Sequence, residues 1–350
     1  MLNFLFGLFS EDLGIDLGTA NTLVLVKGKG IVIREPTVIA QHKKTKDILA
    51  IGTEAKKMVG RTPASIVAVR PLKDGAISDF ESTSAMLSYF INKVHQTPGN
   101  SIFRIPRPQV VIGIPSGVTE VERRAVADAA IEAGARKAYL IEQPMAAAIG
   151  VGLPVAEATG SAIVDIGGGT TEIAVISLGG IVVGKSLRVA GDKMDSEIAS
   201  YIRTRYNVLL GERTAEEAKI AIGNAHSDLS EKEIVVSGRD LETGLPKAIK
   251  LTSSQIREAI MPILTQITAA IAETVEDTPP ELLADIAKAG ITLAGGGAKL
   301  PGLAKFLANE IKLPVIEADD PQSAVVLGTG VVLEDLSLLE RVRLGSRFPI

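Results

Sequence analysis

Residues 163–175 read IVDIGGGTTEIAV, and this stretch decides the fold of the 350-residue chain. An apolar run brings Asp165 to the mouth of a sheet, and three glycines precede a second β-rich run. Because glycine has no Cβ, the backbone here can adopt positive φ and bring N–H groups against phosphate oxygens. A carboxylate beside a phosphate needs a cation between them, so the stretch predicts Mg²⁺ bound mostly through water. A glycine-rich hairpin with an incidental aspartate is the alternative interpretation.

A second copy of this stretch lies near the N-terminus, where residues 14–26 read GIDLGTANTLVLV. Its Asp16 aligns with Asp165, and its Asn21 aligns with Thr170. The two copies are separated by about the length of one domain. The duplication predicts two related domains that bind a nucleotide between paired hairpins. The alternative of an incidental aspartate does not explain why the pattern occurs twice.

Two further glycine-rich stretches lead to different interpretations. Residues 291–299, ITLAGGGAK, repeat the strand-to-triglycine pattern without an aspartate, so we expect a flat adenine or sugar ring to lie on this backbone. Residues 179–186, GGIVVGKS, match the Walker A pattern, which requires a helix that starts at the Lys-Ser pair. Here residues 179–180 indicate a hairpin turn and residues 187–189 indicate a strand, so a P-loop is excluded.

The composition excludes several classes of function. A hydrophobic content of 46% and a charged content of 22% are typical of a soluble globular protein. The net charge of −4 gives no indication of a nucleic-acid partner. Cysteine is absent, so the chain has no disulfide and no thiolate site. The histidines His42, His95 and His226 are too far apart in sequence for the ligand spacing of structural zinc.

The length fits two α/β domains of ordinary size. The first is expected over residues 11–150 plus 322–345, with a small inserted subdomain at about 35–75. The second is expected over residues 151–321, with an insertion at about 191–252. The sequence pattern predicts helices at 53–60, 82–96, 119–134, 193–206, 214–224, 253–275 and 322–333, and strands at 22–27, 31–34, 109–114, 137–141, 232–237 and 246–251.

Residues 1–10, MLNFLFGLFS, form an apolar segment without a charged side chain. The segment is too short to span a bilayer, so we expect a weak membrane-surface contact that a polymer multiplies by avidity. The alternative is packing on its own domain, and the lack of Lys and Arg weakens the membrane interpretation. A second apolar tip lies in the loop 99–108 beside Arg104 and Arg107, with a loop tucked against the domain as its alternative. The candidate membrane contacts are Leu2, Phe4, Leu5, Phe6, Leu8, Phe9, Ile102 and Phe103.

The strand-and-glycine motifs that contain Asp16, Asp165 and Gly295 resemble the three signatures of the actin, Hsp70 and sugar-kinase superfamily. The similarity to the MreB family of bacterial actins is closer and covers residues 11–335. Four longer motifs carry it: GTANT at 18–22, IEQPMAAAIG at 141–150, GGGTTE at 167–172 and GERTAE at 211–216.

This resemblance implies an actin fold of two RNase H-like domains, each with a small inserted subdomain, around a cleft for ATP and Mg²⁺. It also implies self-assembly into filaments on the inner face of the cytoplasmic membrane. There the filaments would organise cell-wall synthesis with transmembrane partners and set a rod cell shape. The expected localisation is cytoplasmic and membrane-associated, and the expected activity is slow filament-coupled ATP hydrolysis rather than metabolic catalysis.

The position of each residue in these motifs implies its role. Asp16 and Asp165 would organise the hydrated Mg²⁺. The expected phosphate contacts are Gly18, Thr19, Ala20, Asn21, Gly167, Gly168, Gly169 and Thr170. The expected ribose and adenine contacts are Glu216, Glu217, Ala218, Lys219, Gly295, Gly296, Gly297, Ala298 and Lys299.

One position departs from the family pattern. Members commonly have Glu-Glu-Pro where this chain has Glu142, Gln143 and Pro144, and the second position is expected to orient the attacking water. An amide cannot act as a base near neutral pH, but it can accept one hydrogen bond from water and donate another. Because positioning does most of the work in phosphoryl transfer, we expect slow hydrolysis with Gln143 and Thr170 placing the water. Glu142 is the reserve candidate, or else forms a salt bridge at the strand end.

Three other functions found in the superfamily are alternatives to a cell-shape filament. A small-molecule kinase needs a catalytic aspartate and a polar acceptor pocket, for which the sequence offers no isolated candidate. An Hsp70-type chaperone needs a peptide-binding domain, for which we expect no room after the helix at 322–333. A plasmid-segregating actin-like filament protein is nearest in class, and the apolar N-terminal segment favours a membrane-bound polymer over it.

Overall fold

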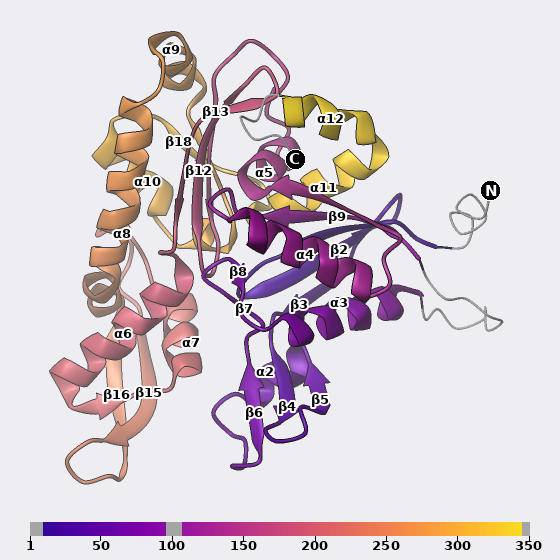
Figure 1. Cartoon of the computed structure of the whole chain (residues 1–350). Coiled ribbons are helices and arrows are strands. Elements are labelled where there is room, and N and C mark those ends of the chain that lie inside the picture. Colours follow the sequence, from indigo (N-terminus) through magenta and orange to yellow (C-terminus); the bar gives the residue numbers. More distant parts are fainter. Residues whose placement is uncertain (1–9, 96–106, 345–350) are drawn as a thin grey trace.

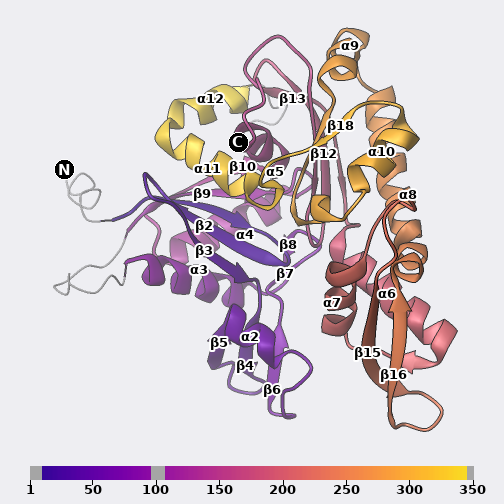
Figure 2. The same cartoon turned by 180° about the vertical axis from the view of Figure 1, so that it is seen from behind.

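The computed structural model of the chain describes residues 10–95 and 107–344. It has two lobes side by side, each containing a five-stranded sheet with helices packed against it (Figure 1; Figure 2 from behind). All candidate membrane contacts, at 2–9 and 102–103, lie outside the described residues. Within the described residues, no helix has both the length and the apolar character needed to cross a membrane.

The first lobe is built on a sheet with the strand order β10-β9-β1-β2-β3. Strands β1 to β3 form an antiparallel meander, while β9 pairs in parallel with both β1 and β10. Alternate residues of β1, Leu13 and Ile15, share a core with two helices, α3 and α4. The bounds are β1 Leu13–Leu17, β2 Asn21–Val26, β3 Gly30–Pro36, α3 Phe80–His95, β9 Gln109–Ile114, α4 Glu120–Glu132 and β10 Lys137–Glu142.

The second lobe repeats this topology with different residues. Its sheet order β18-β17-β11-β12-β13 again combines an antiparallel meander, β11 to β13, with two parallel strands. One face of this sheet packs on helices α6, α8, α9 and α10. The bounds are β11 Ser161–Ile166, β12 Thr171–Ser177, β13 Gly180–Leu187, α6 Gly191–Tyr206, α8 Ser253–Glu276, α9 Pro280–Ala289, β17 Ile291–Ala294, α10 Leu303–Ile311 and β18 Val315–Glu317.

Each lobe also carries a three-stranded sheet, within the stretches for which an insertion is expected. The first lobe has the order β5-β4-β6 with helix α2 and a short hairpin, β7 and β8; the second has β14-β15-β16 with helix α7. The bounds are β4 Ile39–His42, β5 Ile48–Ile51, α2 Thr53–Met58, β6 Ile66–Val69, β7 Leu72–Lys73, β8 Ala76–Ile77, β14 Val208–Leu209, α7 Glu212–Ile222, β15 Glu233–Asp240 and β16 Pro246–Thr252.

Most predicted elements are present within a few residues of their expected bounds. Strand β13 runs straight through Lys185 and Ser186, which confirms that the Walker A match is not a P-loop. The returning helix α11 (Ala324–Glu334) begins after a single 3₁₀ turn, η2 (Pro321–Ser323), rather than at residue 322. Helices α9, α10 and α12 (Leu336–Leu344) and strand β18 were not predicted.

Two helices occupy the space between the sheets, α5 (Gln143–Gly150) and α11. Helix α5 continues from the first lobe but packs on β11 and β12 of the second, while α11 returns from the second lobe and packs on β1 and β9 of the first. A Cβ on Gly150 would lie 1.9 Å from the Ala324 carbonyl oxygen, and a Cβ on Gly328 would lie 1.8 Å from the Ala146 carbonyl oxygen. Only glycine therefore permits this close crossing, which joins the lobes.

We expect Gly328→Ala to lower the free energy of unfolding by about 3 kcal/mol, because the added methyl group overlaps a helix backbone that cannot move aside cheaply. Alanine's better helix propensity offsets about 1 kcal/mol at most. Thermal unfolding measures the loss. Val331→Ala, on the same helix with 46% of Val331 exposed, is the control and should change stability by less than about 0.5 kcal/mol. Equal unfolding midpoints for the two variants would contradict the close crossing.

Candidate functional site

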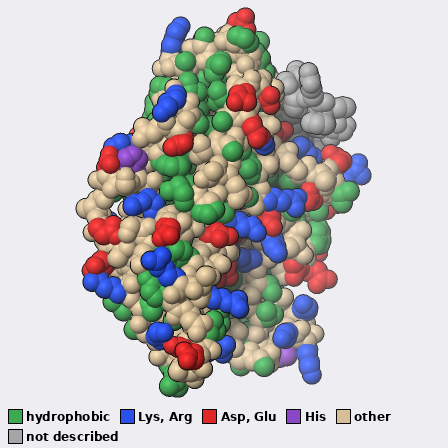
Figure 3. All heavy atoms as spheres, turned by 90° about the vertical axis from the view of Figure 1, so that its left-hand side faces the viewer, with side chains coloured by type: hydrophobic (Ala, Val, Ile, Leu, Met, Phe, Trp, Pro, Cys, Tyr) green, Lys and Arg blue, Asp and Glu red, His purple; other side chains and the backbone are tan. Residues whose placement is uncertain are grey.

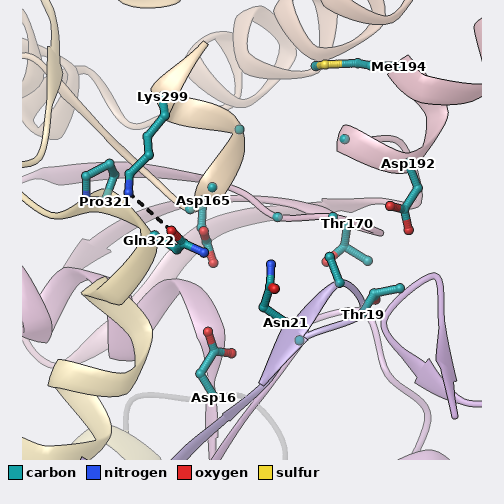
Figure 4. A pocket seen from close by; sticks show the side chains of 18 of the residues that line it. Asp16, Thr19, Asn21, Asp165, Thr170, Asp192, Met194, Lys299, Pro321 and Gln322 are labelled. Carbon is teal, nitrogen blue, oxygen red and sulfur yellow. Dashed lines mark hydrogen bonds between the residues drawn. The ribbon is translucent and has the colours of Figure 1, made fainter. Parts of the chain in front are cut away.

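A cleft of about 370 Å³ lies between the lobes. Both aspartate–glycine hairpins open into it: the first joins β1 to β2, and the second joins β11 to β12. In Figure 4 the side chains of Thr19 and Thr170, one from each hairpin, lie near one another. The cleft is lined by Asp16, Gly18, Thr19, Ala20 and Asn21 of the first hairpin and by Asp165, Gly167, Gly168 and Thr170 of the second.

The glycines of the second hairpin allow the two turns to approach each other. A Cβ on Gly168 would lie 2.5 Å from the Ala20 Cβ, and a Cβ on Gly169 would lie 2.5 Å from the Thr19 Oγ1. The expectation that Gly167, Gly168 and Gly169 use positive φ is wrong, since none of the three does. Gly168 and Gly169 instead leave room for the opposite hairpin, whereas a Cβ on Gly167 would meet only the Thr170 carbonyl oxygen of its own hairpin. Gly169 belongs to this contact and not to the cleft lining.

Asp16 and Asp165 stand at corresponding places near the ends of β1 and β11, and their carboxylates face each other across the cleft (Figure 4). Desolvation raises the pKa of Asp16 to about 7, although the Gln143 amide opposes the shift. Burial, then the charges of Asp16 and Glu172, raise the pKa of Asp165 well above its ordinary value. Two desolvated carboxylates that face each other favour a cation between them.

The residues available to hold such a cation are few. No cluster of three or more His, Cys, Asp or Glu side chains suited to a metal occurs within residues 10–95 and 107–344. The two aspartates could therefore supply only part of a coordination shell, and water and a ligand would supply the rest. This donor set fits Mg²⁺, which usually keeps several waters and binds through one or two carboxylates.

Gln143 and Thr170 both line the cleft, whereas Glu142 does not. Gln143 is the first residue of α5, and its Nε2 donates a hydrogen bond of 3.3 Å to Oδ1 of Asp16. Glu142 lies one residue earlier, at the N-cap of this helix. Because Gln143 is buried and held by Asp16, its amide has a defined orientation at the cleft floor.

Helix α7 brings only part of its predicted set to the cleft. Glu216 and Lys219 line it, but Ala218 is buried in the core. Glu217 is 56% exposed on the other face of the helix and pairs with Arg213 at 2.8 Å. The Lys219 ammonium group is already engaged, since its Nζ lies 2.8 Å from Oδ1 of Asp195 and donates to the Gly191 carbonyl at 2.9 Å.

The third glycine turn packs against the strand that carries Asp165. Gly295 has a φ of 81°, and a Cβ there would lie 2.3 Å from both Oδ1 of Asp165 and the Ile166 carbonyl oxygen. Gly295, Gly296, Gly297 and Lys299 line the cleft, whereas Ala298 is buried in the core. Lys299 also donates a hydrogen bond of 3.2 Å to Gln322 (Figure 4).

Several cleft residues were not predicted from the sequence, notably Asp192, Met194, Asp195 and Gln322. Asp192 and Asp195 are three positions apart in the first turns of α6, a spacing that places both on one helix face. Burial raises the pKa of Asp195 to about 6, although Lys219 opposes the shift. The i, i+3 acidic pair directly after Gly191 was the signal available in the sequence.

We expect Gly168→Ala to separate the two hairpins, because its new methyl group overlaps Ala20 of the opposite lobe. The loss of stability should be about 1–3 kcal/mol, as for other overpacked contacts. Gly296→Ala is the matched control, since that glycine has no neighbour within 4 Å of an added Cβ and no positive φ. Thermal unfolding of both variants checks the prediction, and a Gly168→Ala protein as stable as the control would argue against hairpin contact.

The family described as MreB/Mbl protein matches residues 10–341. The cell shape-determining protein Mbl of Bacillus subtilis (strain 168) is 48% identical over 337 residues, which cover 96% of this chain and 100% of the relative. The cell shape-determining protein MreB of Escherichia coli (strain K12) is 50% identical over 342 residues, 97% of each chain.

Solved structures agree with the sequence relatives. MreB5 of Spiroplasma citri bound to ADP superposes with a TM-score of 0.88 and 38% identity, covering 93% of this chain and 97% of that one. The MamK double helical filament has a TM-score of 0.77 and 20% identity, over 92% of this chain and 98% of that one, and supports the actin-like fold alone. The resemblance seen in the sequence motifs is confirmed, and the chain belongs to the MreB/Mbl family of actin-like proteins.

Proposed function

We propose that this chain is an ATP-binding actin-like protein that polymerises into membrane-associated filaments and organises cell-wall synthesis to set rod cell shape. The observation that carries the proposal is that both aspartate–glycine hairpins line one cleft between two lobes of the same topology. Relatives about half identical to this chain are named for determining cell shape. MreB5 of Spiroplasma citri has been solved with ADP and, at a TM-score of 0.87 and 37% identity, with AMPPNP.

The phosphates of ATP would lie between the two hairpins, near the hydroxyls of Thr19 and Thr170 and the amide of Asn21. The ribose and adenine would lie towards Glu216 and the glycine turn at 295–297, which line the same cleft. Asp16 and Asp165 would hold Mg²⁺ through water. Bound Mg²⁺ supplies the positive charge that offsets the two carboxylates and the phosphates.

Hydrolysis would depend on how this chain positions water. The amide nitrogen of Gln143 donates to Asp16, so its oxygen can accept a hydrogen from a water near the terminal phosphate. Thr170, across the cleft, offers a hydroxyl that can orient the same water. Gln143 has an amide where a carboxylate could act as a base. Gln143 and Thr170 would therefore orient the water without removing its proton, so ATP turnover is expected to be slow.

The hydrolysis proposal predicts that Gln143→Ala lowers phosphate release from polymerised protein by about tenfold to hundredfold, as expected for loss of a positioned hydrogen-bonding group. Phosphate release is measured with ATP and Mg²⁺, and with EDTA added as the blank. Glu142→Gln is the control and should turn over at nearly the parent rate, since Glu142 does not line the cleft. If Gln143→Ala were as fast as the parent, the water-positioning assignment would be wrong.

The two candidate membrane segments are flanked by described residues that contact each other. The N–H of Arg107 donates to Oγ of Ser10 at 2.8 Å, and the N–H of Glu11 donates to Nε2 of His95 at 2.9 Å. The described residues that flank positions 1–9 and 96–106 are therefore neighbours on the first lobe. A filament of such subunits would present both apolar sets to one surface, where avidity multiplies a weak contact.

The expected partners are further copies of this chain, the inner face of the cytoplasmic membrane and transmembrane proteins of cell-wall synthesis. Nucleic acid is not among them. Figure 3 views the molecule from the side on which α8, α9 and α10 of the second lobe lie, and acidic and basic side chains are interspersed there with hydrophobic ones. A face of mixed charge lacks the uniformly basic character that attracts nucleic acid.

The membrane proposal predicts that the full chain with ATP pellets with vesicles of phosphatidylethanolamine and phosphatidylglycerol, and that deleting residues 2–9 removes most of this binding. Ile102→Ser with Phe103→Ser tests the second segment, and filament formation without lipid is the control for assembly. Binding that survives the deletion but not the double substitution would assign the contact to Ile102 and Phe103. Binding that survives both changes would contradict the proposal.

A further inference from the structure

Three ion pairs join the two lobes at one side of the cleft. Arg70, between β6 and β7 of the first lobe, places Nη1 2.9 Å from Oδ2 of Asp192 and Nη2 3.0 Å from Oε1 of Glu212. Lys56, on α2, places Nζ 2.8 Å from Oε1 of Glu216. Both bases belong to the first lobe, and the three acids belong to α6 and α7 of the second.

Two of the three pairs are more sheltered than ordinary surface pairs, whereas Glu212 of the third pair has a side chain that is 58% exposed. The side chains of Lys56 and Glu216 are 34% and 22% exposed, and those of Arg70 and Asp192 are 32% and 27% exposed. Partial burial reduces screening by salt, so such pairs hold two surfaces together better than exposed ones. Arg70 also has two acidic partners on different helices, a geometry that suits its planar guanidinium group.

The pairs are continuous with the cleft. Asp192 and Glu216 each line it, so the carboxylates of two of the three pairs also face the ligand space, whereas Glu212 does not line the cleft. Beside them lies a cavity of about 20 Å³ whose wall includes Val38 and Val59 as well as the paired side chains. This space is large enough for little more than one water molecule. On this side of the cleft, the paired side chains hold the two lobes together with little space between them.

We propose that Lys56 and Arg70 form an electrostatic latch that must open before a nucleotide enters or leaves the cleft, and that the latch sets the rate of nucleotide exchange. The inference rests on the proposed binding of ATP. It adds that exchange is limited by separation of α2 and the β6–β7 segment from α6 and α7. Breaking the latch therefore speeds both association and dissociation, whereas loss of a ligand contact would speed dissociation alone.

The chain offers matched controls for charge. Lys57 neighbours Lys56 on α2 but pairs with Glu54 of the same helix at 2.6 Å. Arg213 neighbours Glu212 on α7 but pairs with Glu217 of its own helix. Neither pair crosses between the lobes. Lys57→Gln and Arg213→Gln thus remove the same charges as Lys56→Gln and Arg70→Gln without opening the latch.

The test is stopped-flow fluorescence with ATP that carries a methylanthraniloyl label, followed by a chase with excess unlabelled ATP and Mg²⁺. We expect Lys56→Gln and Arg70→Gln each to raise the association and dissociation rates about threefold, and the double variant to raise them about tenfold. The two control variants should stay within about 1.5-fold of the parent. In the parent, raising KCl should speed dissociation, and this salt dependence should be smaller in the double variant.

A charge-reversal variant distinguishes loss of the latch from a general disturbance of the structure. Arg70→Glu should release nucleotide fastest, and adding Glu212→Arg to it should recover part of the slow release, because one pair re-forms with reversed charges. Unchanged thermal unfolding shows that each variant is folded. If Lys56→Gln and Arg70→Gln exchange at the rates of the controls, the latch is wrong while ATP binding stands. If the parent binds no labelled ATP, the proposed function is wrong and the latch falls with it.

Discussion

The constraint on which the rest of the structure depends is the pair of desolvated carboxylates, Asp16 and Asp165, that face each other across the cleft. Two such groups repel each other and disfavour their own ionisation, so the fold must hold them in place against a cost that protonation or a bound cation relieves. Each is fixed at the end of a central strand whose parallel neighbour has a small residue opposite it, Gly113 beside Asp16 and Ala294 beside Asp165. The duplicated sheet is thus a scaffold for one charge pair.

The two hairpins around Asp16 and Asp165 could be predicted because short stretches of sequence specify them. An apolar run that ends in aspartate and then glycine identifies both hairpins, and the residues named there line the cleft, apart from Gly169. What glycine does could not be predicted locally. Gly168 has an ordinary φ and is required by a neighbour in the other lobe, whereas Gly295 combines a positive φ with close packing on β11. Only the assembled fold distinguishes these two reasons.

The ribose and adenine side was harder to predict because its residues lie on helices. A motif names consecutive positions, but a helix turns only part of its circumference towards a cleft. The run Glu216, Glu217, Ala218 and Lys219 therefore divides between the cleft, solvent and the core. The engagement of Lys219 by Asp195 depends on contact between α6 and α7, and the Arg70 pairs depend on contact between lobes. Such long-range partners have no signature in a single sequence.

The crossing of α5 and α11 connects the contact between the lobes to a residue of the cleft. Gln143 is hydrogen-bonded to Asp16 of the first lobe, yet it begins the helix that packs on β11 and β12 of the second. The far end of that helix is locked against α11 by Gly150 and Gly328. Gln143 therefore contacts the first lobe through Asp16 and the second lobe through its own helix, while Thr170 lines the same cleft from the second lobe. Under the proposed hydrolysis, a water held by Gln143 and Thr170 would contact both lobes, so its position would depend on how the lobes are packed together.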